Sequence, residues 1–158
     1  MPCHLRKNKA TGRMEVNADY HQEKIQEDLD FGLPAEEAVI DKLSKHFKES
    51  ITAMPKGWGY DAESKQARYE IKTRKGVGFD TYETQIIPHH KLRHKTRGKE
   101  LTFVFNLTDG IYYINYEQEQ FNKYEDEFIG ASRSENGVAV WNRVLHIHIP
   151  KGDLQLLR

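Results

Sequence analysis

The stretch Arg68-Tyr69-Glu70-Ile71-Lys72-Thr73 decides the expected fold of this chain. Successive side chains of a β-strand point to opposite faces, with a period of two residues. Tyr69 and Ile71 therefore share one face, which suits packing against a core. Glu70 and Lys72 share the other face, so the strand presents a carboxylate beside an ammonium group.

The residues just before this strand predict a β-hairpin. Residues 58–63 and 66–74 have strand-like patterns, and the polar pair Ser64-Lys65 between them suits a turn. Asp61 lies on the first of these two strands. We therefore expect the Asp61 carboxylate to lie close to Glu70 across the hairpin.

A helix is predicted over residues 34–48, because Pro34 suits the first turn and apolar residues recur with helical spacing. At 100° per residue, Glu36 falls on the same face as Ile40 and Leu43, whereas Glu37 points to one side. An inward carboxylate is costly unless it is paired or binds a cation. The alternative is that Glu36 only stabilises the helix N-terminus through the dipole. If the helix packs beside the hairpin, Glu36 joins Asp61 and Glu70.

Three carboxylates and a lysine from three elements can hold a divalent metal ion. Mg²⁺, or Mn²⁺ in its place, prefers oxygen ligands and keeps several waters. Asp61 and Glu70 are the expected direct ligands, the Ile71 backbone carbonyl a third, and Glu36 a ligand through water. Lys72 is expected to orient the attacking water and to stabilise negative charge in the transition state of phosphodiester hydrolysis.

The rest of the chain predicts an α/β protein with a mixed central sheet. Two strands, 101–107 and 111–116, flank a turn at Thr108-Asp109-Gly110. Residues 84–97 are expected to be a loop leading into a short helix. Residues 138–141 and 144–149 are expected to be two further strands, and residues 154–157 a short helix. We expect one domain over 1–158, with residues 1–14 a flexible basic arm.

Composition narrows the class of protein. The net charge is zero, 30% of the residues are charged and one is cysteine. These values, with no long apolar run, indicate a soluble, intracellular, cytoplasmic protein without a membrane segment or internal disulfide. Between residues 89 and 99 the chain has no acid and five basic residues, Lys91, Arg93, Lys95, Arg97 and Lys99. This basic stripe is expected to contact nucleic-acid phosphates, the alternative being a solvated surface.

With these residues in place, the chain resembles the PD-(D/E)xK nuclease superfamily over about residues 31–116. Gly32-Leu33-Pro34-Ala35-Glu36 is similar to that family's opening helix, and Tyr69-Glu70-Ile71-Lys72-Thr73 to its core strand. Tyr60-Asp61 stands where the family has Pro-Asp, so the proline is missing. The resemblance implies a restriction-endonuclease-like core, with a mixed four-stranded sheet flanked by helices. It also implies magnesium-dependent DNA cleavage, and it adds Gln85 as a polar residue near the active site.

Two rival interpretations remain open at this level. One is a non-catalytic nucleic-acid-binding module that uses the stripe 89–99. The other is a structural protein in which Glu70 and Lys72 form only an ion pair. For a nuclease, one site cuts one strand, so cleavage of both DNA strands suggests a homodimer. The residues do not distinguish among DNA structures as substrates, or DNA from RNA.

Overall fold

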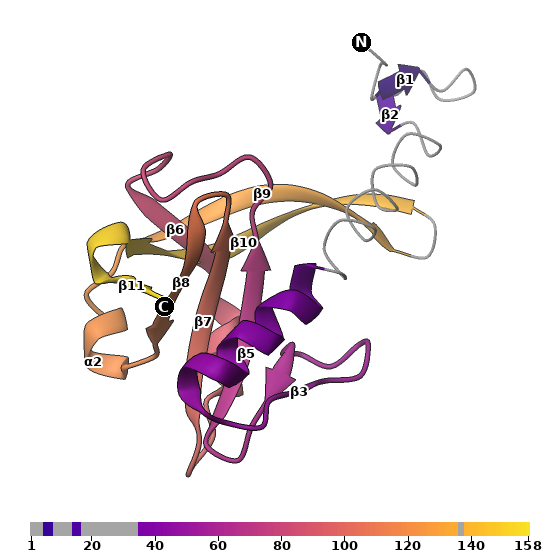
Figure 1. The fold of residues 1–158 in the computed structure, drawn as a ribbon. Helices are drawn as coiled ribbons and strands as arrows, with labels where there is room; N and C mark the ends of the chain where they lie inside the picture. The colour runs from indigo at the N-terminus through magenta and orange to yellow at the C-terminus, as the bar shows by residue number, and fades with distance from the viewer. Residues whose placement is uncertain (1–4, 8–13, 17–34, 136–137) are drawn as a thin grey trace.

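The computed structural model describes residues 5–7, 14–16, 35–135 and 138–158, and Figure 1 shows their arrangement. Strands β1 (Leu5–Lys7) and β2 (Met14–Val16) pair antiparallel, with Leu5 opposite Val16. The predicted flexible arm therefore contains one strand of a small hairpin. Residues 1–4 and 8–13 of that arm lie outside the described residues.

A six-stranded mixed sheet forms the centre of the fold. Its order is β11-β8-β7-β5-β4-β3, with β5 and β7 parallel and the other neighbours antiparallel. The strands are β3 (Thr52–Ala53), β4 (Ala62–Glu63), β5 (Ala67–Thr73), β7 (Glu100–Leu107), β8 (Gly110–Asn115) and β11 (Gln155–Leu156). The predicted α/β class and mixed sheet are confirmed.

Strand β7 is buried on both faces, which explains its nearly continuous apolar sequence. Leu101, Phe103 and Phe105 point to one core, whereas Val104 points to the other. The single buried hydroxyl of this stretch, Thr102, donates a hydrogen bond to Asn115 Oδ1 at 2.8 Å. The parallel pair β5–β7 therefore lies between two hydrophobic layers.

One of these layers is made by the helix at residues 35–47, which confirms the predicted helix (Figure 1). Val39 and Leu43 are buried against Tyr69 and Ile71 of β5. The apolar face of the helix thus packs on the face of β5 that carries Tyr69 and Ile71, as the alternation in β5 predicts. None of the described helices is long and apolar enough to cross a membrane.

The second layer is a three-stranded antiparallel sheet in the order β6-β10-β9. It consists of β6 (Thr84–Pro88), β9 (Asp126–Glu135) and β10 (Val138–Pro150). Ile87, Ile147 and Ile149 pack against the apolar face of β7. The short helix α2 (Gln118–Phe121) adds Phe121 to the same core.

Several expectations are corrected here. The central sheet has six strands rather than four, and mainly a second sheet, instead of helices, covers its other face. Residues 84–88 form a strand, the two strands expected within 138–149 are one, and β11 replaces the expected helix at 154–157. Each of these strands pairs with residues distant in sequence. Local propensity does not predict such pairing, which is why these elements differ from the expectations.

Candidate active site

Strand β5 carries the centre of the candidate site. Because Tyr69 and Ile71 pack on the helix side, Glu70 and Lys72 share the opposite face, as predicted. Lys72 Nζ lies 2.9 Å from Glu70 Oε1. Glu70 is only 2% exposed, so its carboxylate is an acid held inside the protein.

The two oxygens of the Glu70 carboxylate have different surroundings. Oε1 contacts Lys72 and also Lys91, whose Nζ lies 3.2 Å away. Oε2 is buried, and none of the described residues donates a hydrogen bond to it. An unpartnered buried carboxylate oxygen is costly, unless a cation completes its coordination.

Asp61 is fixed beside β5 by two hydrogen bonds. Its backbone N–H donates to the Tyr69 carbonyl at 2.9 Å, and its Oδ2 accepts from the Ile71 N–H at 2.7 Å. Burial raises the Asp61 pKa, and the Glu70 charge raises it further, against the lowering effects of the Ile71 N–H and two lysines. The site therefore holds Asp61 in a place where a cation would stabilise its charged form.

The Ile71 carbonyl is directed toward the same place. In a strand, the N–H and C=O of one residue point to the same neighbour. Since the Ile71 N–H reaches Asp61, its C=O also points past the end of β4, where the pairing stops at Ala62 and Tyr69. This orientation agrees with the predicted role of Ile71 as a backbone ligand.

Glu36 joins the group from the first turn of the described helix. It is half-buried, whereas Glu37 is exposed, so Glu36 is the inward carboxylate. Its pKa is raised from 4.5 to about 7 by burial, then by the charges of Asp61 and Glu70, against a smaller lowering by Lys72. The three acids are thus electrostatically coupled, although the helix and hairpin are separate elements.

The raised pKa of Glu36 makes the stability of the metal-free protein depend on pH. The folded state binds the Glu36 proton more tightly than the unfolded chain, so the free energy of unfolding falls as pH rises from 4.5 to about 7. We expect Glu36→Gln to remove this part of the fall and to melt above the parent at about pH 8. Thermal melts of the parent, Glu36→Gln and the exposed control Glu37→Gln across this range measure it. Identical pH profiles for the parent and Glu36→Gln would contradict the inward position.

Gln85 lies on β6 (Thr84–Pro88), a strand of the second sheet. It is buried, and none of the described residues accepts a hydrogen bond from its Nε2. It lines a cavity of about 390 Å³ together with Arg74 and His148, whereas Asp61, Glu70 and Lys72 do not line that cavity. The proposed role of Gln85 at the active site therefore stays a prediction.

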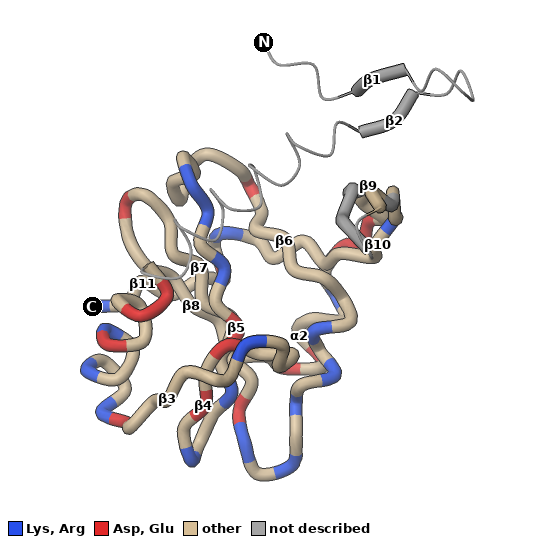
Figure 2. The backbone as a smooth tube through the Cα atoms, turned by 90° about the vertical axis from the view of Figure 1, so that its right-hand side faces the viewer, with Lys and Arg blue, Asp and Glu red and all other residues tan. Residues whose placement is uncertain are grey.

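The basic stripe divides into inward and outward residues. Lys91 lies on the 3₁₀ helix η1 (His89–His94) and points into the site, whereas Arg93 and Arg97 are exposed. Lys95 donates to the Lys99 carbonyl within its own loop. Figure 2 shows these basic positions following one another between β6 and β7. The sequence predicts Lys91 only as a phosphate contact of the stripe. Its contact with Glu70 was not predicted, because the alternating basic residues do not indicate which side chain points inward.

The donor set fits a hard divalent cation. Within the described ranges, no group of three His, Cys, Asp or Glu side chains is close enough to hold a metal by itself. Magnesium needs only one or two carboxylates when waters complete its shell. Asp61, Glu70 Oε2 and the Ile71 carbonyl supply oxygen donors of that kind.

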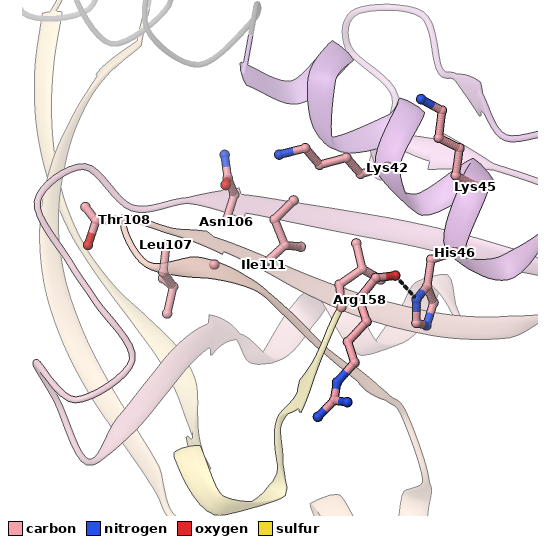
Figure 3. Close-up of a pocket in the computed structure, with 10 residues that line it drawn as sticks. Lys42, Lys45, His46, Asn106, Leu107, Thr108, Ile111 and Arg158 are labelled. Carbon is pink, nitrogen blue, oxygen red and sulfur yellow. Dashed lines mark hydrogen bonds between the residues drawn. The ribbon is translucent and has the colours of Figure 1, made fainter.

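A second cavity, of about 510 Å³, lies between the helix and the β7–β8 turn. Its basic lining residues are Lys42, Lys45, His46 and Arg158. Figure 3 shows that the Arg158 guanidinium points away from the two lysine ammonium groups, while the His46 ring bonds the Arg158 carbonyl oxygen at 2.9 Å. Because these cations do not converge, we do not assign the cavity to the site.

No protein family, curated protein or solved structure matches this chain. The geometry of the residues themselves is therefore the basis for a functional proposal.

Proposed function

We propose that this chain is a metal-dependent endonuclease that hydrolyses DNA phosphodiester bonds. The observation that carries the proposal is the buried Glu70 Oε2, to which no residue in the described part of the chain donates a hydrogen bond. Glu70 shares its strand face with Lys72, and Asp61 bonds the next residue, Ile71. The predicted β-hairpin supplies these groups, and the predicted helix adds Glu36.

Asp61, Glu70 and the Ile71 carbonyl are the residues that would hold Mg²⁺ or Mn²⁺, with Glu36 acting through water. When bound, such an ion lowers the pKa of its water and polarises the phosphoryl oxygen. Glu36, with a pKa raised to about 7, can exchange a proton with water near neutral pH. The buried position of Glu70 limits bulk water at the carboxylate that would hold the ion.

Lys72 is proposed to stabilise the negative charge that develops on the phosphate. Its Nζ is held 2.9 Å from Glu70 Oε1, so the ammonium stays at one place beside the proposed ion site. A fixed charge costs little reorganisation when the reaction proceeds, which is the basis of electrostatic catalysis.

The four-stranded part β4-β5-β7-β8, with the helix at 35–47, supports membership of the PD-(D/E)xK superfamily. It carries Asp61, Glu70 and Lys72 in the order that the resemblance implies. We further propose that two copies act together as a homodimer when both strands of a duplex are cut, since each copy offers one such site.

The proposal is tested by incubating the protein with linear, circular, branched and single-stranded DNA, and with RNA. We expect cleavage with Mg²⁺ or Mn²⁺, and none after addition of a chelator. Cleavage that persists in chelator would contradict the metal role. Metal binding without cleavage of any of these substrates would reject the nuclease activity.

A non-catalytic nucleic-acid-binding module is the second candidate, because Glu70 already contacts two lysines and could be purely structural. This alternative predicts DNA binding that is indifferent to Mg²⁺ and to Asp61→Asn. The same DNA panel, measured for binding as well as cleavage, distinguishes the two functions.

Arg93 and Arg97 should each contribute to the salt dependence of DNA binding, because both side chains are exposed in the protein without DNA. We expect Arg93→Ala and Arg97→Ala each to reduce the slope of log affinity against log salt by roughly one unit. The measurement uses a labelled duplex in Ca²⁺, with Lys65→Ala as an exposed control. Unchanged slopes would show that these arginines do not contact phosphates and would favour the interpretation of the stripe as a solvated surface.

A further inference from the structure

The ammonium group of Lys91 has two partners inside the protein. Its Nζ donates to the Gly59 carbonyl at 2.9 Å and lies 3.2 Å from Glu70 Oε1. The Lys91 side chain is 20% exposed, so most of it is covered. Among the residues of the basic stripe, Lys91 is the one that contacts the candidate site.

The fold holds Lys91 in this position through η1. The ring of His94 packs against Gly59 so closely that a Cβ there would lie 2.2 Å from the ring. Arg68 on β5 donates to the His94 carbonyl at 3.0 Å. These contacts attach η1 to both the loop before Asp61 and the strand that carries Glu70.

The ammonium groups of Lys72 and Lys91 both contact Glu70 Oε1, and they affect how well Glu70 can bind a metal ion. Lys72 and Lys91 together offset the negative charges of Glu70 and Asp61. A divalent cation that approaches Glu70 is therefore repelled by two nearby positive charges. Removing either charge favours the ion.

The two lysines lie on different structural elements. Lys72 belongs to β5, whereas Lys91 lies on the same short η1 as the exposed Arg93. A backbone phosphate bound at that face would offer Lys91 a second anionic partner. A phosphate and Glu70 would then compete for the same ammonium group.

We propose that Lys91 is a built-in counter-ion of Glu70 that couples metal binding to DNA binding. Without DNA, Lys91 neutralises Glu70 and weakens its affinity for the cation. With DNA, Lys91 pairs with a backbone phosphate and leaves Glu70 to the ion. This inference rests on the proposed nuclease function, and Lys91 acts in it as a positioning residue.

Such coupling is reciprocal, so DNA tightens metal binding by the same factor by which metal tightens DNA binding. The coupling can therefore be measured from either side. Metal binding to the protein alone and DNA affinity with and without metal together define it.

The test uses Ca²⁺ in the full chain, with isothermal titration for the ion and fluorescence anisotropy of a labelled duplex for DNA. We expect Lys91→Met to bind Ca²⁺ about fivefold more tightly than the parent without DNA, and to lose most of the gain in DNA affinity that Ca²⁺ causes. Lys65→Met removes an exposed charge outside the stripe and outside the candidate site, and should match the parent. Unchanged or weaker Ca²⁺ binding by Lys91→Met overturns the proposal.

A charge-preserving variant separates loss of charge from loss of the Gly59 contact. Lys91→Arg should keep the parental coupling, and a Lys91→Arg protein that behaves like Lys91→Met also overturns the proposal. A different result would contradict the nuclease proposal itself. In that case the parent binds no Ca²⁺, or binds it equally well after Asp61→Asn.

Discussion

Replacing Glu70 by Gln is expected to abolish DNA cleavage, lowering the rate by about 10³-fold or more. The amide has nearly the same shape as the carboxylate but lacks the charge that would attract the ion to the buried Oε2 position. Glu70→Gln also leaves Lys72 and Lys91 without their shared anion, so a change in stability is expected too. Cleavage rates at saturating Mg²⁺, beside melting curves, separate the two effects.

Asp61→Asn is the second variant that keeps this test informative. Its amide oxygen can still accept the Ile71 N–H, so the hairpin contact survives while the charge is lost. Glu37→Gln, on the exposed side of the helix, is the matched control and should cleave like the parent. Full activity in folded Glu70→Gln or Asp61→Asn would reject the carboxylates as the ion site.

Lys72→Ala is expected to lower turnover by about 10²-fold or more while DNA affinity changes little. The reason is that Lys72 touches Glu70 inside the site, whereas the exposed arginines of the stripe are the expected phosphate contacts. Its loss therefore removes charge stabilisation from the transition state rather than from the bound ground state. Single-turnover rates and DNA affinity, measured on the same preparations, give this comparison.

The chain has a natural control for Lys72, because Glu63-Ser64-Lys65 repeats the Glu-x-Lys spacing. In that triplet Glu63 pairs with Lys99, and Lys65 is exposed in the turn. Lys65→Ala should leave turnover unchanged. If Lys72→Ala instead weakens DNA binding at unchanged turnover, Lys72 is a phosphate contact and not a catalytic residue.

The two Glu-x-Lys triplets show that the three-residue pattern alone does not identify a candidate active site. Both have Glu and Lys at the same spacing, yet Glu70 is buried, with one oxygen that receives no hydrogen bond from the described residues, and Glu63 lies in a partly exposed ion pair. In the sequence, the two triplets differ in their flanking residues. Glu70 lies in a strand with apolar alternation, whereas Ser64-Lys65 has the polarity of a turn.

By itself, the sequence determined the elements whose signals are local. Apolar spacing predicts the helix with Glu36 turned inward, and alternation in 68–73 places Glu70 and Lys72 on one face of β5. The turn at 108–110 predicts the β7–β8 hairpin. Helical and strand periods are properties of neighbouring residues, so a short stretch of sequence is enough to predict these elements.

Only the tertiary structure decided which distant segments meet. It pairs β6 with the far end of β10, turns Lys91 toward Glu70, and brings Gln85 and His148 to one cavity. It also adds β3 and β11 to the edges of the central sheet. Strand pairing and side-chain direction in a loop depend on burial against partners far along the chain, and no local period encodes those partners.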